Sequence, residues 1–311
     1  NIMVKTCIIF SGQGSQYPGM GKELLNLFPH LQYIFGCGSD ILGFDLKRVC
    51  FDSTAEELAQ TEFSQPAIFA TSLLAYEAVK QLGVIPNAVA GHSLGEYAAM
   101  VASGMLSLEN GFFVIQQRAK AMGECAKSQD GAMCAVLGLG ADEVAAVCET
   151  IDGYVVPVNF NAPTQTVIAG ERAAVDRAIE AFAAMGKRTA KLAVSAAFHS
   201  KLMQGAADAF YQGIQHIKFN PPTVAFYSNV TGEELIDFSD MPSYCKTHLV
   251  SPVQFVKELN AIQQAGVSRF VECGPNKVLS GLVKKTLSDV IIENIENEKS
   301  FFKFKDSIAT A

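Results

Sequence analysis

One serine of this chain stands between two glycines in a pattern that could support nucleophilic catalysis. Residues 91–95 read Gly-His-Ser-Leu-Gly; they follow the short apolar run 88–90 and precede helix-forming residues from Glu96 onward. In such a strand–turn–helix, the hydroxyl of Ser93 is displayed at a helix N-terminus, where backbone N–H groups and the helix dipole favour a developing oxyanion. The open alternative is that Ser93 caps the helix, with Glu96 as the acid of a capping box.

A serine hydroxyl needs a base within hydrogen-bond reach near neutral pH, and histidine is the most common one. The chain has five histidines. We expect His30, His216 and His248 in or beside surface helices, and His92 lies inside the serine motif itself. His199 lies in a loop between an expected strand and an expected helix, where catalytic groups are commonly displayed. It is our predicted base, with a hydrogen-bonded core histidine as the alternative.

The hydrophobic pattern predicts the elements that would position these residues. Residues 4–10 indicate a buried strand that ends in a tight loop, and a helix is expected from about Met20. Residues 66–82 have apolar side chains near helical spacing, and Gly83 follows where a C-cap is expected. Further strands are expected at 88–90, 224–227, 267–272 and 290–295, with helices between them.

From about residue 131, strands and helices are predicted in the order βαββαβ. The strands are expected at 132–139, 154–160, 165–169 and 188–194, and the helices at 142–150 and 171–185. This order is typical of a ferredoxin-like module. We therefore predict an α/β fold: a large α/β-hydrolase-like domain with a parallel sheet, formed by residues 1–128 and 196–311, and interrupted by a small ferredoxin-like subdomain at 129–195.

Composition excludes several classes of function. The 311 residues are 49% apolar, in runs far too short to cross a bilayer, and the start shows no signal region. A net charge of −7 argues against a nucleic-acid partner, and eight cysteines without CxxC pairs indicate buried thiols in a reducing compartment. We expect a soluble cytoplasmic protein without a membrane partner. The pattern contains no metal-ligand cluster and no GxGxxG fingerprint, so no bound cofactor is expected.

Seven segments, in order along the chain, together resemble the malonyl-CoA:acyl-carrier-protein transacylase family, which also occurs as acyltransferase domains of fatty-acid and polyketide synthases. They are FSGQGSQ at 10–16, GHSLGEY at 91–97, QR at 117–118, NFNAP at 159–163, FHS at 198–200, SPVQ at 251–254 and ECGP at 272–275. The resemblance spans almost the whole chain. It implies transfer of a malonyl group from malonyl-CoA, as a substrate, to a holo acyl carrier protein through an ester on Ser93, with ping-pong kinetics.

The resemblance also assigns roles to particular residues. It implies that His199 is the general base and that the backbone N–H groups of Gln13 and Leu94 form the oxyanion hole. The main-chain carbonyl of Gln254 is implied to hold the imidazole, in place of the aspartate of a usual triad. Arg118 is implied to grip the free carboxylate of malonyl bidentately, whereas without the family it reads as a solvated helix charge.

Four residues are expected to line the substrate pocket: Phe198, Asn161, His92 and Met122. The ring of Phe198 should crowd an α-methyl branch and so disfavour methylmalonyl, with ordinary core packing as the alternative. Asn161 could hydrogen-bond near the acyl thioester, although an asparagine before Ala-Pro is equally natural in a turn.

An acyl carrier protein is typically acidic, so this acidic chain must meet it through a local basic surface. The candidates are Lys187, Arg188, Lys191, Lys284 and Lys285, each of which could instead be an ordinary solvated charge. We expect a monomer. The alternatives left open are a trans-acting acyltransferase of a polyketide synthase, an α/β-hydrolase esterase or thioesterase, and a non-catalytic interaction protein. Transfer of malonyl to carrier protein, rather than rapid hydrolysis, would exclude the esterase.

Overall fold

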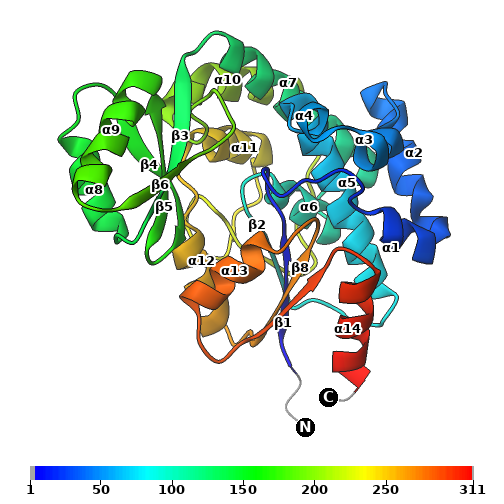
Figure 1. Ribbon diagram of the computed structural model, residues 1–311. Helices are drawn as coiled ribbons and strands as arrows, with labels where there is room; N and C mark the ends of the chain where they lie inside the picture. Colours follow the sequence, from blue (N-terminus) through cyan, green and yellow to red (C-terminus); the bar gives the residue numbers. More distant parts are fainter. Residues whose placement is uncertain (1–3, 310–311) are drawn as a thin grey trace.

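Two β-sheets organise the chain in the computed structural model, which describes residues 4–309 (Figure 1). The larger sheet is parallel, and its strands follow the spatial order β7-β2-β1-β8-β9. Their bounds are β1 (Thr6–Phe10), β2 (Ala88–Gly91), β7 (Ala225–Phe226), β8 (Arg269–Cys273) and β9 (Ile291–Ile295). The expected parallel α/β sheet is therefore confirmed, with the strand that leads into the serine motif next to its centre.

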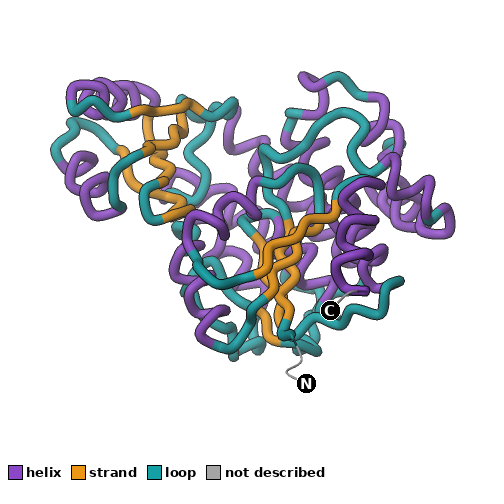
Figure 2. The backbone as a smooth tube through the Cα atoms, turned by 60° about the horizontal axis from the view of Figure 1, so that its bottom comes forward, coloured by secondary structure: helices purple, strands orange, loops and turns teal. Residues whose placement is uncertain are grey.

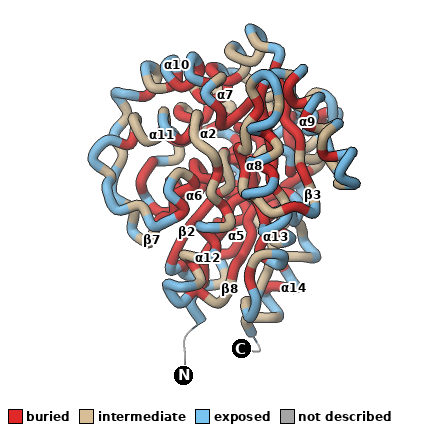
Figure 3. The backbone as a smooth tube through the Cα atoms, turned by 90° about the vertical axis from the view of Figure 1, so that its left-hand side faces the viewer, coloured by how far each residue is buried: buried red, intermediate tan, exposed pale blue. Residues whose placement is uncertain are grey.

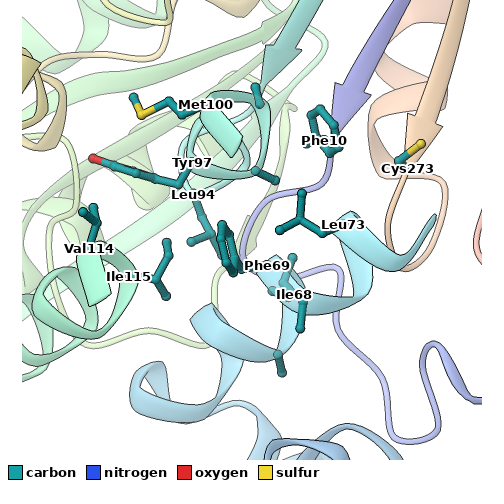
Figure 4. Close-up of a cluster of buried hydrophobic side chains, with 14 of the residues drawn as sticks. Phe10, Ile68, Phe69, Leu73, Leu94, Tyr97, Met100, Val114, Ile115 and Cys273 are labelled. Carbon is teal, nitrogen blue, oxygen red and sulfur yellow. The ribbon is translucent and has the colours of Figure 1, made fainter. Parts of the chain in front are cut away.

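Helices pack on both faces of this sheet, so its central strand is buried on both sides. Ile8 and Phe10 point into a large core with α5 (Thr61–Lys80), α6 (Gly95–Ala102) and α7 (Leu108–Lys127). Cys7 and Ile9 point into a second core with α12 (Phe255–Gln264) and α13 (Val278–Thr286). Figure 4 shows Phe10 of the first core beside Leu73. The helices of this part are α1 (Lys22–Leu27), η1 (Pro29–Gln32), α2 (Tyr33–Leu42), α3 (Leu46–Asp52), α4 (Ala55–Leu58), α5 (Thr61–Lys80), α6 (Gly95–Ala102), α7 (Leu108–Lys127), η2 (Lys201–Met203), α10 (Gln204–Ile214), α11 (Met241–Val250), α12 (Phe255–Gln264), α13 (Val278–Thr286) and α14 (Glu298–Ala309).

The smaller sheet is antiparallel and lies apart from the parallel one (Figure 2). Its elements follow the chain as β3 (Gly131–Leu137), α8 (Ala141–Glu149), β4 (Val155–Ala162), β5 (Gln165–Glu171), α9 (Arg172–Ala184) and β6 (Arg188–Lys191). The spatial order β4-β5-β3-β6 places the first and third strands in the middle, as the ferredoxin-like arrangement requires. A separate hydrophobic core lies between this sheet and its two helices. The exact boundaries of the two predicted domains stay a prediction.

Strand β4 joins the smaller sheet to the rest of the chain. The N–H of Phe160 donates to the carbonyl of Val253 at 2.9 Å, and the N–H of Val253 donates to the carbonyl of Val158 at 2.8 Å. These bonds connect β4 to the segment between α11 and α12. As Figure 3 shows, buried backbone continues from the parallel sheet toward the elements of the smaller one. The segment after β6, which carries His199, therefore returns to the large core beside this junction.

Candidate active site

Ser93 occupies a turn between β2 and α6 that only a glycine-flanked residue can form. A Cβ atom at Gly91 would collide with the backbone of Gly95, and one at Gly95 would collide with the carbonyl of Phe10. Ser93 itself has φ of 54°, a left-handed conformation that is unfavourable for a residue with a side chain. The motif therefore builds the strained strand-to-helix turn that displays a nucleophile.

The structure brings the predicted base to the predicted nucleophile. Ser93 Oγ lies 2.6 Å from Nε2 of His199, although 106 residues separate them in the sequence. His199 also has a positive φ, 65°, and its side chain is almost fully buried. Ser93 Oγ does not cap α6, since its two polar contacts are the imidazole and Arg118. The capping alternative is therefore not supported.

The tautomer of His199 follows from what its other nitrogen faces. Nδ1 lies 3.1 Å from the carbonyl oxygen of Ser251 and 3.2 Å from that of His248. Because both partners can only accept, Nδ1 carries the proton and the lone pair on Nε2 faces Ser93. The predicted role of Gln254 is thus wrong: its carbonyl accepts from the N–H of Glu258 at the start of α12.

Burial keeps His199 in its basic form. Desolvation, together with the positive charge of Arg118 and the neighbouring His92, lowers the pKa of His199 to about 3. A neutral imidazole can accept the hydroxyl proton without first losing one to solvent. The arrangement can therefore activate Ser93 well below the pH at which a free histidine would be protonated.

A flat pH profile for acylation is expected from this lowered pKa. Because His199 stays neutral below the usual histidine range, the rate of Ser93 acylation should stay constant between about pH 7 and about pH 5. It should fall only as the pH approaches the lowered value. Rapid-quench measurement of acylation across this range, with circular dichroism to confirm that the chain stays folded, checks the expectation. An acid limb with an apparent pKa near 6.5, the ordinary value of histidine, would contradict it.

Arg118 is a buried cation beside the nucleophile. It extends from the middle of α7 with 1% of its surface exposed, so the reading as a solvated helix charge is wrong. One terminal nitrogen donates to Ser93 Oγ at 3.2 Å and the other to Oε1 of Gln65 at 3.0 Å, while its Nε has no hydrogen-bond partner. Across residues 4–309 it forms no ion pair with a carboxylate. Such a charge favours an anionic ligand, because an unpaired buried guanidinium is costly.

A cavity of about 170 Å³ opens beside Ser93 and His199. The residues that line it are Gln13, Gly14, Gln16, Ala59, His92, Ser93, Met122, Met133, Asn159, Leu192, Ala193, Val194, Phe198 and His199. Three of the expected pocket residues, His92, Met122 and Phe198, are among them. Asn161 is not one of the lining residues. Its Oδ1 lies 2.7 Å from Nε2 of His92, so Asn161 contacts a residue that lines the cavity. Asn159 lines the cavity instead.

The two backbone N–H groups expected to form the oxyanion hole belong to segments that meet here. Gln13 lies in the loop after β1 and lines the cavity, and Leu94 directly follows Ser93. Within the part of the chain that the structure describes, neither N–H donates a hydrogen bond to another group. Both N–H groups are therefore available to bind an oxyanion.

Two parts of the site were missed at the sequence level. His248 was expected in or beside a surface helix, but it is buried and its ring lies 5.7 Å from that of His199. Asn229, Glu96 and Glu258 form a buried polar cluster beneath the turn of Ser93. Burial raises the pKa of Glu96 to about 8, against the lowering effect of bonds from Tyr244 and Asn229. Nothing in their spacing signals this cluster, because its members come from three separate elements.

Known proteins resemble this chain over nearly its whole length. Residues 7–305 match the family model described as acyl transferase domain. The malonyl CoA-acyl carrier protein transacylase of Bacillus subtilis is 38% identical over 287 residues, which cover 91% of this chain and 90% of that protein. The crystal structure of the Clostridium perfringens transacylase has a TM-score of 0.94 and 35% identity, with 98% of each chain covered. A malonyl-transacylase solved with a holo type II PKS acyl-carrier protein has a TM-score of 0.93 and 33% identity, covering 97% of this chain and 99% of that one.

Proposed function

We propose that this chain, which belongs to the acyl transferase domain family, transfers a malonyl group from malonyl-CoA to the phosphopantetheine thiol of an acyl carrier protein. The observation that carries the choice of substrate is Arg118, a buried guanidinium that touches Ser93 Oγ and forms no ion pair within residues 4–309. A malonyl thioester carries a free carboxylate at one end and the reactive carbonyl at the other. It therefore matches a cation placed beside a nucleophile.

In the first half-reaction, His199 Nε2 removes the proton from Ser93 Oγ as that oxygen attacks the thioester carbonyl. The N–H groups of Gln13 and Leu94 stabilise the oxyanion that develops on the carbonyl oxygen. When the tetrahedral intermediate collapses, the C–S bond breaks and the imidazolium gives its proton to the leaving thiolate of coenzyme A. The product is a malonyl ester on Ser93.

In the second half-reaction, the thiol of the carrier protein attacks this ester, and His199 accepts the thiol proton. Collapse returns that proton to Ser93 Oγ and releases malonyl carrier protein. The carbonyls of Ser251 and His248 lie at the C-terminal end of α11 and accept from Nδ1. They take the place of a triad carboxylate, and the negative end of the helix dipole favours the transient imidazolium.

A thioesterase reading fits this site less well. Because His199 is oriented by backbone carbonyls, the acid that a hydrolase triad would use is missing from its contacts in the described part of the chain. Hydrolysis of a thioester that lacks a free carboxylate also does not require a cation at Arg118. Incubation with carbon-14 malonyl-CoA and holo carrier protein tests the proposal: the label should move to the carrier protein. Release of the label mainly as free malonate would contradict it.

The proposed pathway is fatty-acid synthesis, for which the enzyme supplies extender units. The alternative, a trans-acting acyltransferase of a polyketide synthase, is also supported, because one similar structure is a transacylase with a type II PKS carrier protein. No bound cofactor is proposed; coenzyme A enters as part of the substrate. Within residues 4–309, every helix falls short of the length and hydrophobicity that a bilayer crossing needs. A cytoplasmic monomer is our proposal for its state in the cell.

The surface that docks the carrier protein is a proposal based on charge. Lys187, Arg188 and Lys191 lie at the β6 end of the smaller sheet, and Lys284 and Lys285 lie in the last turn of α13. Lys191 already pairs with Asp176 at 2.7 Å, and Lys285 donates to Gln165 at 3.2 Å. The ion pair of Lys191 and the hydrogen bond of Lys285 reduce the attraction of either lysine for an acidic partner.

Replacing Phe198 by alanine should relax the selection against branched substrates. Its ring lines the cavity beside His199, where an α-methyl group would lie. A methyl group in an apolar pocket changes selectivity by about 10- to 200-fold, so F198A should raise kcat/KM for methylmalonyl-CoA relative to malonyl-CoA by roughly tenfold or more. Competition between the two thioesters measures the ratio. The matched control F302A, on the exposed face of α14, should leave it unchanged, and an unchanged ratio in F198A would contradict the role.

A further inference from the structure

Asn229 is a buried side chain that the reaction steps above do not use. It follows β7 and has 1% of its surface exposed. Its Oδ1 accepts the backbone N–H of Ser93 at 2.7 Å and lies 3.2 Å from Nε2 of His248. Its Nδ2 donates to the carbonyl of Gly91 at 2.7 Å and to Oε1 of Glu258 at 2.8 Å. Both hydrogens and both lone pairs of the amide are thus in use, which fixes its orientation.

Two of these four bonds enclose the strained turn. The carbonyl of Gly91 and the N–H of Ser93 lie on either side of His92, immediately before the left-handed conformation of Ser93. A residue with a side chain leaves that conformation unless its surroundings hold it there. A planar amide that binds one donor and one acceptor of the same turn fixes the spacing between them. The side chain of Asn229 therefore holds the backbone that aims Ser93 Oγ.

The side-chain bond to His248 connects this turn to the residues that hold the base, and the main chain of Asn229 adds a further bond. The N–H of Asn229 donates to Oε2 of Glu96 in the first turn of α6, at 2.6 Å. Nε2 of His248 contacts Oδ1 of Asn229, and the carbonyl of the same His248 faces Nδ1 of His199. The path from the N–H of Ser93 to the imidazole of His199 thus passes through two buried side chains. Figure 3 shows β7, β2, α6 and α11 on one side of the molecule.

We propose that Asn229 is a positioning residue for acyl transfer: it holds Ser93 in its strained conformation and fixes the nucleophile relative to the end of α11 that orients His199. This inference rests on the proposed function. It concerns the rate at which Ser93 is acylated and not the affinity for malonyl-CoA, because Asn229 does not line the cavity.

Pre-steady-state acylation of two variants tests the inference. N229A removes all four side-chain bonds, and we expect its rate of acylation per folded molecule to fall by about 100-fold or more, with KM for malonyl-CoA unchanged. In the double variant N229D/E258Q, one carboxylate oxygen at position 229 still accepts from Ser93 N–H. The other oxygen accepts from the amide introduced at position 258, so that bond is kept with donor and acceptor exchanged. It loses the donor to the carbonyl of Gly91, so its rate should lie between those of N229A and the unmodified enzyme.

A matched control separates positioning from loss of stability. V144A truncates a fully buried side chain of α8, in the separate core of the smaller sheet, and should lower the melting temperature without lowering the rate per folded molecule. The amplitude of the acylation burst counts folded molecules, so the rate constant is independent of how many remain. A rate for N229A within about threefold of the unmodified enzyme, or a rate for N229D/E258Q equal to it, would overturn the inference. If N229A does not fold, the double variant decides by itself. Absence of any burst in the unmodified enzyme would instead refute the proposed function.

Discussion

Replacing Ser93 by alanine should abolish the covalent malonyl-enzyme and lower kcat for malonyl transfer by about 10⁴-fold or more. The hydroxyl oxygen is the atom that becomes acylated once His199 has removed its proton, and it lies 2.6 Å from Nε2 of His199. The fold should survive, because Ser93 Oγ bonds only to His199 and Arg118, and the loss of a hydroxyl leaves little empty space. Steady-state transfer of carbon-14 malonyl to holo carrier protein measures the loss.

The serine that caps the C-terminal end of α6 offers a control for this variant. Ser103 is buried and its hydroxyl contacts only the carbonyl of Met100, so S103A should keep its transfer rate within about twofold. If S93A retained more than a few per cent of the transfer rate, the chemistry would not pass through this hydroxyl.

Replacing Arg118 by glutamine should invert the choice of acyl group. Malonyl would lose the buried cation beside Ser93, and removing one member of a buried ion pair costs about 3–5 kcal/mol, or roughly 10²- to 10⁴-fold in kcat/KM. Acetyl-CoA has no carboxylate, so in the unmodified enzyme it leaves the buried guanidinium without an anionic partner. The variant removes that penalty, and its kcat/KM for acetyl-CoA should rise.

Direct comparison of malonyl-CoA and acetyl-CoA in R118Q measures the inversion. The control R172Q removes an arginine of α9 whose ion pair with Asp130 is largely exposed, and both rates should stay unchanged. Equal losses for both thioesters in R118Q would show that Arg118 supports the fold or Ser93 in general, and not the malonyl carboxylate.

Local patterns were enough to predict the main elements of this fold. The βαββαβ order of the smaller sheet and the strand–turn–helix around Ser93 both follow from periodicity and from glycine at fixed positions. Most of α5 could also be predicted, although the helix begins at Thr61 and includes Pro66, where the pattern had placed its start. These helices, strands and turns depend on residues only a few positions apart, so they could be predicted from the sequence.

Contacts between distant segments could not be predicted in the same way. The carbonyl that holds His199 was assigned to Gln254, whereas the structure uses Ser251 and His248. Every residue has a carbonyl, so nothing in a residue type reveals which one faces an imidazole. The burial of Arg118 is similar: a cation within an amphipathic helix is usually solvated, but here neighbouring elements cover it, among them α5 through Gln65 and α6 through the ring of Tyr97. The family resemblance indicated the role of Arg118, but the residue pattern alone did not.

The central claim is that the malonyl group travels through an ester on Ser93. The most direct test is a chase experiment: the enzyme is mixed with malonyl-CoA, freed of excess substrate, and then mixed with holo carrier protein. The account predicts one malonyl group on the peptide that contains Ser93, removed by the carrier protein at least as fast as kcat. A malonyl group on another residue, or an adduct that decays more slowly than turnover, would contradict it.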